Sequence, residues 1–167
     1  MLQSEVSAGT AGKKGYWGVA MFLGFIPLLG LVVIAYNVFA FAGATFVGEW
    51  TGMEPFLAKT VFTVNMVSGD TWHVMTSDLI LAVSLVMLFL EIVRSASFGR
   101  TEILNHALSM GVFIVAMIEF LILKGFATSA FFLITVMTLI DVLGGFIIGI
   151  ISARRDIGLA GGIADNA

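Results

Sequence analysis

The 167-residue sequence has no cysteine, which excludes disulfide bonds and thiolate metal sites. Charged residues are also scarce, at 11% of the chain against about 25% in soluble domains. What remains is apolar: hydrophobic residues make up 59% of the chain, and the mean hydropathy is +1.07. A chain of this composition cannot cover itself with a polar surface, so the lipid bilayer is its expected solvent.

The recognised signatures of catalytic and nucleotide-binding sites are missing as well. The sequence contains no GxGxxG, Walker A, HExxH, GxSxG or CxxC pattern. Its few basic residues flank apolar segments and form no patch of the kind that binds nucleic acid. We therefore expect no enzymatic activity, no metal, no cofactor and no nucleic-acid partner.

Four long apolar segments predict an all-α integral membrane protein, a four-transmembrane-helix bundle in a single membrane domain over 1–167. A span needs about 20 predominantly apolar residues. Pro27 lies inside the first segment and is expected to kink it. The Gly-rich stretch after the fourth segment is expected to be a flexible tail. The predicted helices are roughly 17–43, 75–94, 102–123 and 129–153.

A secretory signal peptide is the alternative interpretation of the first segment. Lys13-Lys14 supplies a basic start, and Ala40-Phe41-Ala42 resembles a cleavage site. No charge occurs from Gly15 to Gly48, however, and this run is longer than the apolar region of a usual signal peptide. The length favours a retained helix.

The loop 44–74 between the first two helices is β-prone. Thr60 to Val74 is rich in Thr, Val and Phe, and Ser68-Gly69-Asp70 is a turn signal in its middle. These features predict a short hairpin, with an interfacial amphipathic helix over 56–67 as the alternative. The side chains in this loop best suited to contact a partner are Glu49, Trp50, Trp72 and His73.

The distribution of Lys and Arg predicts the orientation in the membrane. One side of the predicted bundle receives six basic residues, namely Lys13, Lys14, Arg94, Arg100, Arg154 and Arg155. The other side receives Lys59 and Lys124. We therefore expect both termini in the cytoplasm and the loop 44–74 outside, as in a multi-pass protein of a bacterial inner membrane.

Three carboxylates fall inside the predicted helices: Glu91, Glu119 and Asp141. Ionisable side chains are costly in a bilayer and by default suggest function. In a purely structural interpretation Glu91 pairs with Arg94 and Glu119 with Lys124, whereas Asp141 needs a proton or a partner from another helix or subunit. The polar residues predicted at a similar depth to Asp141 are Arg94, Asn105 and His106.

Small and polar residues share the helix faces that carry these carboxylates. Asp141, Gly144, Gly145, Gly149 and Ser152 lie at helical spacing, and Gly145 and Gly149 form a GxxxG pair. Such faces allow close approach of another helix in lipid. We therefore expect the carboxylates to point into protein, and the glycines to pack against another helix or another copy of the chain.

Three functions are compatible with these features. The first is a structural or accessory role, in which the protein assembles with itself or within a larger membrane complex. The second is an oligomeric proton- or cation-conducting channel or transporter that uses Asp141. The third is the binding or sensing of a periplasmic partner through the loop 44–74.

Overall fold

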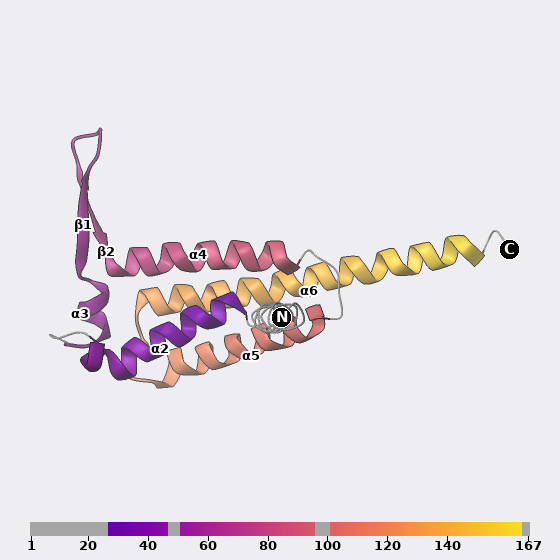
Figure 1. Ribbon diagram of the computed structural model, residues 1–167, viewed down its shortest axis with the longest axis horizontal. Coiled ribbons are helices and arrows are strands. Elements are labelled where there is room, and N and C mark those ends of the chain that lie inside the picture. Colours follow the sequence, from indigo (N-terminus) through magenta and orange to yellow (C-terminus); the bar gives the residue numbers. More distant parts are fainter. Residues whose placement is uncertain (1–26, 47–50, 96–100, 165–167) are drawn as a thin grey trace, which may run out of the picture.

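Four long helices dominate the computed structural model, which describes residues 27–46, 51–95 and 101–164 (Figure 1). They are α2 (Leu28–Phe46), α4 (Thr76–Ser95), α5 (Thr101–Ile122) and α6 (Ser129–Ala164). All four are long and apolar enough to cross a membrane. The mostly helical fold and the four candidate spans agree with the sequence-based prediction.

The predicted boundaries hold within one residue at both ends of α4 and α5 and at the start of α6, but not at the end of α6. α2 runs to Phe46, and residues 17–26 of the first predicted helix lie outside the described residues. Pro27 stands directly before α2, where its missing N–H costs no helical hydrogen bond.

The flexible tail predicted after residue 153 is wrong up to Ala164, because α6 continues to that residue (Figure 1). Most residues of this stretch are Ala, Arg, Ile or Leu, which favour or tolerate a helix. Each of its glycines weakens a helix by about 1 kcal/mol without ending it.

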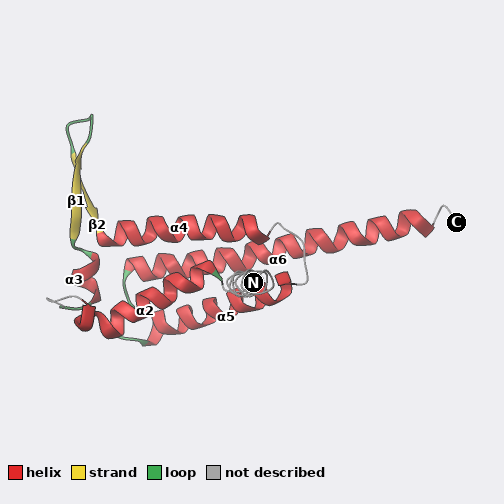
Figure 2. Ribbon diagram, in the orientation of Figure 1, coloured by secondary structure: helices red, strands yellow, loops and turns green. Residues whose placement is uncertain are grey.

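The segment between α2 and α4 contains a short helix and a hairpin (Figure 2). The helix is α3 (Met53–Leu57), and β1 (Thr60–Asn65) pairs antiparallel with β2 (Thr71–Met75). Gly69 provides the positive φ of 95° that the turn requires. The alternative of an amphipathic helix over 56–67 is wrong, because the β-branched residues of β1 form a strand instead.

An aromatic core packs the helices together at the hairpin end. Tyr36 of α2 lies against Phe126 and Phe131, with ring centroids 5.4 and 4.5 Å away. Its hydroxyl lies 2.7 Å from Thr128 Oγ1, so the connection between α5 and α6 is tied to α2. The other buried members of this core are Val33, Met53, Leu57, Ala116, Ala130 and Ile134.

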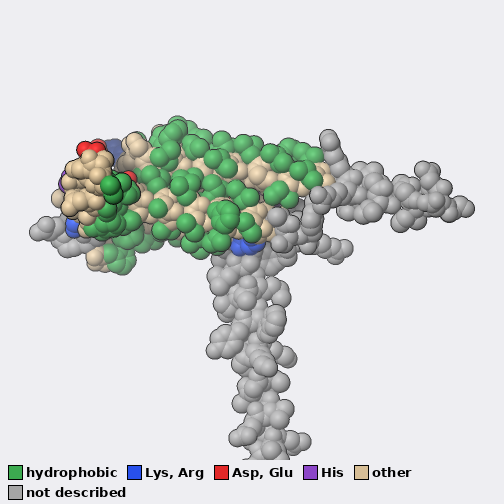
Figure 3. All heavy atoms as spheres, turned by 90° about the horizontal axis from the view of Figure 1, so that it is seen from above, with side chains coloured by type: hydrophobic (Ala, Val, Ile, Leu, Met, Phe, Trp, Pro, Cys, Tyr) green, Lys and Arg blue, Asp and Glu red, His purple; other side chains and the backbone are tan. Residues whose placement is uncertain are grey.

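The outside of the bundle is apolar (Figure 3). Large hydrophobic side chains on every long helix are exposed, including Phe41 on α2, Phe89 on α4, Leu121 on α5 and Phe146 on α6. Soluble monomers rarely expose contiguous apolar surface of this extent, so the helices require an apolar environment.

Candidate functional site: a polar cluster between the helices

Glu91 of α4 is fully buried and uses both carboxylate oxygens. Oε1 accepts a hydrogen bond from Arg94 Nη2 at 3.0 Å, and Oε2 accepts one from the backbone N–H of Leu29 at 3.1 Å. Leu29 lies in the first turn of α2, where backbone N–H groups have no partner within the helix. A carboxylate there also faces the positive end of the helix dipole. Glu91 therefore caps α2 from a neighbouring helix.

Arg94 extends this connection to a third helix. The same Nη2 atom that pairs with Glu91 donates to Asn105 Oδ1 of α5 at 3.0 Å. The pairing of Glu91 with Arg94 that their spacing predicts is present. The guanidinium also reaches Asn105, which the sequence predicted at a similar depth in the membrane. These three side chains link α4 to α2 and α5.

Asp141 of α6 is 5% exposed, and its carboxyl group lies close enough to the Ser109 hydroxyl on α5 for the two groups to interact. The side chains of Glu91, Arg94 and His106 are all close enough to interact electrostatically with its carboxyl group. The structure thus gathers the inner polar residues named from the sequence. Ser109 is added to them, and the Arg94 guanidinium, which pairs with Glu91, is also near Asp141.

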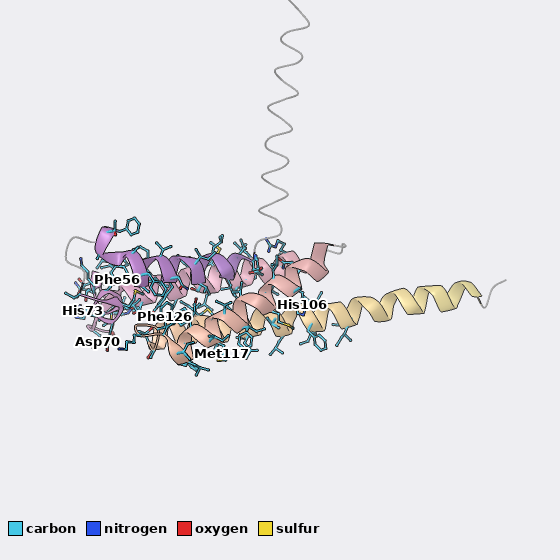
Figure 4. All side chains as sticks on the ribbon, turned by 90° about the horizontal axis from the view of Figure 1, so that it is seen from below. Phe56, Asp70, His73, His106, Met117 and Phe126 are labelled. Carbon is cyan, nitrogen blue, oxygen red and sulfur yellow. The ribbon has the colours of Figure 1, made fainter. Side chains whose placement is uncertain are left out.

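A cavity of about 330 Å³ opens beside Asp141. Its polar lining comes from α5 and α6 together with Ser95 at the end of α4, and Figure 4 shows His106 near the crossing of α5 and α6. The volume exceeds that of several water molecules, each of which occupies about 30 Å³ in the liquid. The polar residues and glycines that α5 and α6 contribute to the lining are Asn105, His106, Ser109, Asp141, Gly145 and Gly149.

The three glycines of the predicted packing face have different surroundings. A Cβ placed on Gly145 would lie 2.6 Å from His106 Nδ1, so the imidazole occupies the space that a side chain would need. A Cβ on Gly144 would lie 3.9 Å from Ile92, and one on Gly149 would meet no atom within 4 Å. Gly145 therefore accommodates His106 within the chain, whereas Gly149 leaves an open surface.

Replacing Gly145 with Ala is expected to destabilise the protein relative to Gly149→Ala. Both changes bring the same helix propensity, but only Gly145→Ala displaces His106, and overpacking typically costs about 1–3 kcal/mol. Thermal unfolding in mild detergent, followed by circular dichroism, measures the difference. Equal melting temperatures for the two variants would show that His106 does not need this space.

Glu119 of α5 belongs to a second polar contact, away from the inner cluster. Its Oε2 accepts a hydrogen bond from Asn37 Nδ2 of α2 at 2.9 Å, and the same amide nitrogen donates to the carbonyl of Val33. Lys124, the partner expected from the sequence, is not the residue that holds it. Sequence reasoning overlooked Asn37, although an amide inside a long charge-free run was a usable signal.

Of the outer-loop candidates, the structure describes Trp72 and His73, and neither joins the two polar contacts. Trp72 and His73 lie on β2, and Figure 4 shows His73 at the end of the molecule opposite the C-terminal part of α6. Both side chains are exposed. Glu49 and Trp50 lie outside the described residues.

The cluster contains Ser, His and carboxylate side chains but not the arrangement of a catalytic triad. A serine nucleophile requires a hydrogen bond to its general base, usually an imidazole. In the part of the chain that the structure describes, no hydrogen bond from Ser109 to His106 is present, and the Ser109 hydroxyl lies beside Asp141. Within the described residues, no three His, Asp or Glu side chains converge in a way that would hold a metal ion. What this arrangement can do is join helices and offer hydrogen bonds to the contents of the cavity.

No family model matches this chain, and it has no match among curated proteins or solved structures.

Proposed function

We propose that this chain is a four-span membrane protein with a structural, accessory role, which assembles with itself or as a subunit of a larger membrane complex. The observation that carries the proposal is the use made of Glu91, Glu119 and Asp141. Glu91 and Glu119 accept hydrogen bonds from Leu29 and Asn37 of α2. Asp141 is buried on α6 beside Ser109 of α5. Intramembrane carboxylates that hold helices together account for their cost in lipid without a catalytic role.

The dimensions of α6 support assembly with other protein. Its 36 residues give a length of about 54 Å at 1.5 Å per residue, whereas a hydrocarbon core is about 30 Å thick. Figure 1 shows that α6 runs well beyond the ends of α4 and α5. Isolated helical segments of this size are marginal in water, so a partner is expected to cover the extension.

The orientation of the bundle in the membrane is inferred from the number of Lys and Arg residues at each of its ends. Arg154 and Arg155 lie in the extension of α6, and Lys59 and Lys124 lie at the hairpin end. Under the positive-inside rule the extension is cytoplasmic and the hairpin is outside. A reporter fused after Ala167 should therefore behave as cytoplasmic, and one inserted near Gly52 as extracytoplasmic.

Assembly is tested at Gly149, since Gly145 is occupied by His106. Gly149→Leu should shift the complex purified in mild detergent to a lower mass, because leucine holds an approaching backbone away. Gly111→Leu on α5 is the matched control, because a Cβ there also meets no atom within 4 Å. Multi-angle light scattering gives the protein mass. A wild-type mass equal to the 17.8 kDa monomer, with no co-purifying chain, would contradict the proposal.

The cavity beside Asp141 favours a second candidate, transport of protons or cations by an oligomer. An acidic side chain at a cavity between helices is a usual element of an ion pathway. The cavity is lined by one stretch of α5 and α6 and by Ser95 at the end of α4, so a second copy would have to complete a path across the bilayer. Binding of an extracytoplasmic partner by the loop 44–74 is the remaining alternative.

A further inference from the structure

The hairpin has one apolar and one polar face. The register pairs Phe62 with Val74 and Val64 with Trp72, and cross-strand partners point to the same side of a sheet. The opposite face carries two further pairs, Thr63 with His73 and Asn65 with Thr71. A hydrogen bond of 3.3 Å from Thr71 Oγ1 to Asn65 Oδ1 joins the second of these pairs.

Among the described residues, protein covers the apolar face only at its base. Val74, next to α4, is 3% exposed, whereas Phe62 and Trp72 are 49% and 51% exposed. The turn adds Val67, which is fully exposed. A two-stranded ribbon with this much uncovered apolar surface is marginally stable in water by itself, so another surface is expected to cover it.

The hairpin is fixed in direction relative to the bundle. β2 continues directly into α4, and the backbone N–H of Thr76 donates to the carbonyl of Lys59 at 2.9 Å. Asp78 of the first turn of α4 accepts a hydrogen bond from the N–H of Met75. Figure 1 shows the ribbon standing nearly at right angles to α4 and reaching beyond the side of the bundle.

The apolar face of the hairpin points to the side on which the four helices extend. Val74 is buried at the junction with the bundle, and the other members of its face lie in line with it. In Figure 3 the ribbon points toward the viewer. Its hydrophobic side chains, in green, lie on the side of the ribbon that faces the helices. This face therefore continues the apolar outer surface of the bundle around a right angle.

We propose that the hairpin lies flat on the outer surface of the membrane, with Phe62, Val64 and Trp72 in the boundary between lipid headgroups and acyl chains. This inference rests on the proposed insertion of the four helices. If they cross the bilayer, a ribbon perpendicular to them at the end of α4 is parallel to the membrane surface. Trp side chains are enriched at this depth.

The backbone sets the depth of the ribbon. In a two-stranded sheet each strand has one edge whose N–H and C=O groups have no strand partner. Such groups cost several kcal/mol each in hydrocarbon but find water and headgroups at the interface. The apolar face and the unpaired edges are both accommodated at the headgroup level. There the polar face, with His73 and Thr63, is directed to water.

The absence of cysteine makes a direct test available. Single variants Val64→Cys and Thr63→Cys, adjacent in β1 and on opposite faces, are spin-labelled in nanodiscs of phosphatidylcholine and phosphatidylglycerol. Collision with oxygen reports lipid, and collision with a water-soluble nickel chelate reports water. The oxygen-to-nickel ratio should be several-fold higher at position 64 than at position 63. Phe89→Cys on the exposed side of α4 is the reference inside the span.

Each other result has a distinct meaning. Nickel access at both hairpin positions would place the ribbon in water and overturn the inference. Shielding of position 64 from both reagents would mean that a second copy or a partner protein covers it, which also overturns the inference. Nickel access at position 89 would instead refute the four-span insertion itself, and this inference would fall with it.

A second measurement avoids labels in the hairpin. In the variant Trp17→Phe/Trp50→Phe, Trp72 is the only tryptophan. Its fluorescence should be quenched severalfold more by lipids brominated near the headgroup end of the acyl chain than by lipids brominated near its terminal methyl. Absence of quenching by either lipid would overturn the inference.

Discussion

Glu91→Ala is expected to destabilise the protein more than any other single truncation of a polar side chain in the described bundle. The change removes the carboxylate that pairs with Arg94 and uncovers the N–H of Leu29 at the start of α2. Breaking a buried ion pair by removing one member costs about 3–5 kcal/mol. We expect the lower part of this range, because the Arg94 side chain is 30% exposed and keeps its hydrogen bond to Asn105. Unfolding by increasing mole fraction of sodium dodecyl sulfate, followed by circular dichroism, measures the loss.

Two variants separate the contributions at this site. Glu91→Gln retains an acceptor for Leu29 but removes the charge opposite Arg94, so its stability should lie between those of the wild type and Glu91→Ala. Asp78→Ala, at the other end of α4, removes a single contact to the N–H of Met75, for which capping data suggest about 1 kcal/mol. If Glu91→Ala unfolds at the same detergent fraction as Asp78→Ala, Glu91 is not the link between α2 and α4 that its contacts indicate.

Features with a local signature in the sequence were predictable. α4 and α5 are apolar runs bounded by polar residues, and each predicted end lies within one residue of the structure. The hairpin followed from β-branched residues around Ser68-Gly69-Asp70. The inward face of α6 followed from helical spacing, which placed Asp141 on a buried side.

Partners on different helices were not predictable, because they depend on the rotation and axial position of each helix. Glu119 accepts a hydrogen bond from Asn37, which is 82 residues away in the sequence. The sequence alone could not show that Asn37, and not the nearby Lys124, would be its partner. Leu29 contributes a backbone N–H, which no side-chain pattern marks. Gly145 was recognised as a packing residue, but that its neighbour is His106 depends on how α5 crosses α6.

Asp141→Leu is expected to weaken the bundle and its assembly, whereas Asp141→Asn is expected to preserve both. Asn has nearly the same size as Asp, and its side-chain oxygen can accept a hydrogen bond from Ser109. Leu offers the buried Ser109 hydroxyl no acceptor, at a cost of about 1–3 kcal/mol, whereas the loss of the negative charge near Arg94 and His106 is common to both variants. Thermal unfolding in mild detergent and light-scattering mass measure the two effects. Ser109→Ala is the control that removes the donor and keeps the carboxylate.

The same pair of variants separates the structural role from transport. If Asp141 only holds α5 to α6, Asp141→Asn assembles normally, and neither it nor the wild type conducts ions in reconstituted vesicles. If Asp141 carries protons or cations, wild-type vesicles dissipate an imposed pH or cation gradient, and Asp141→Asn abolishes the flux at unchanged mass, because an amide does not ionise. Intact gradients with the wild type over a range of pH would eliminate transport. Lost flux in a fully assembled Asn variant would eliminate the purely structural role, because Asn keeps an acceptor for Ser109 and removes only the charge.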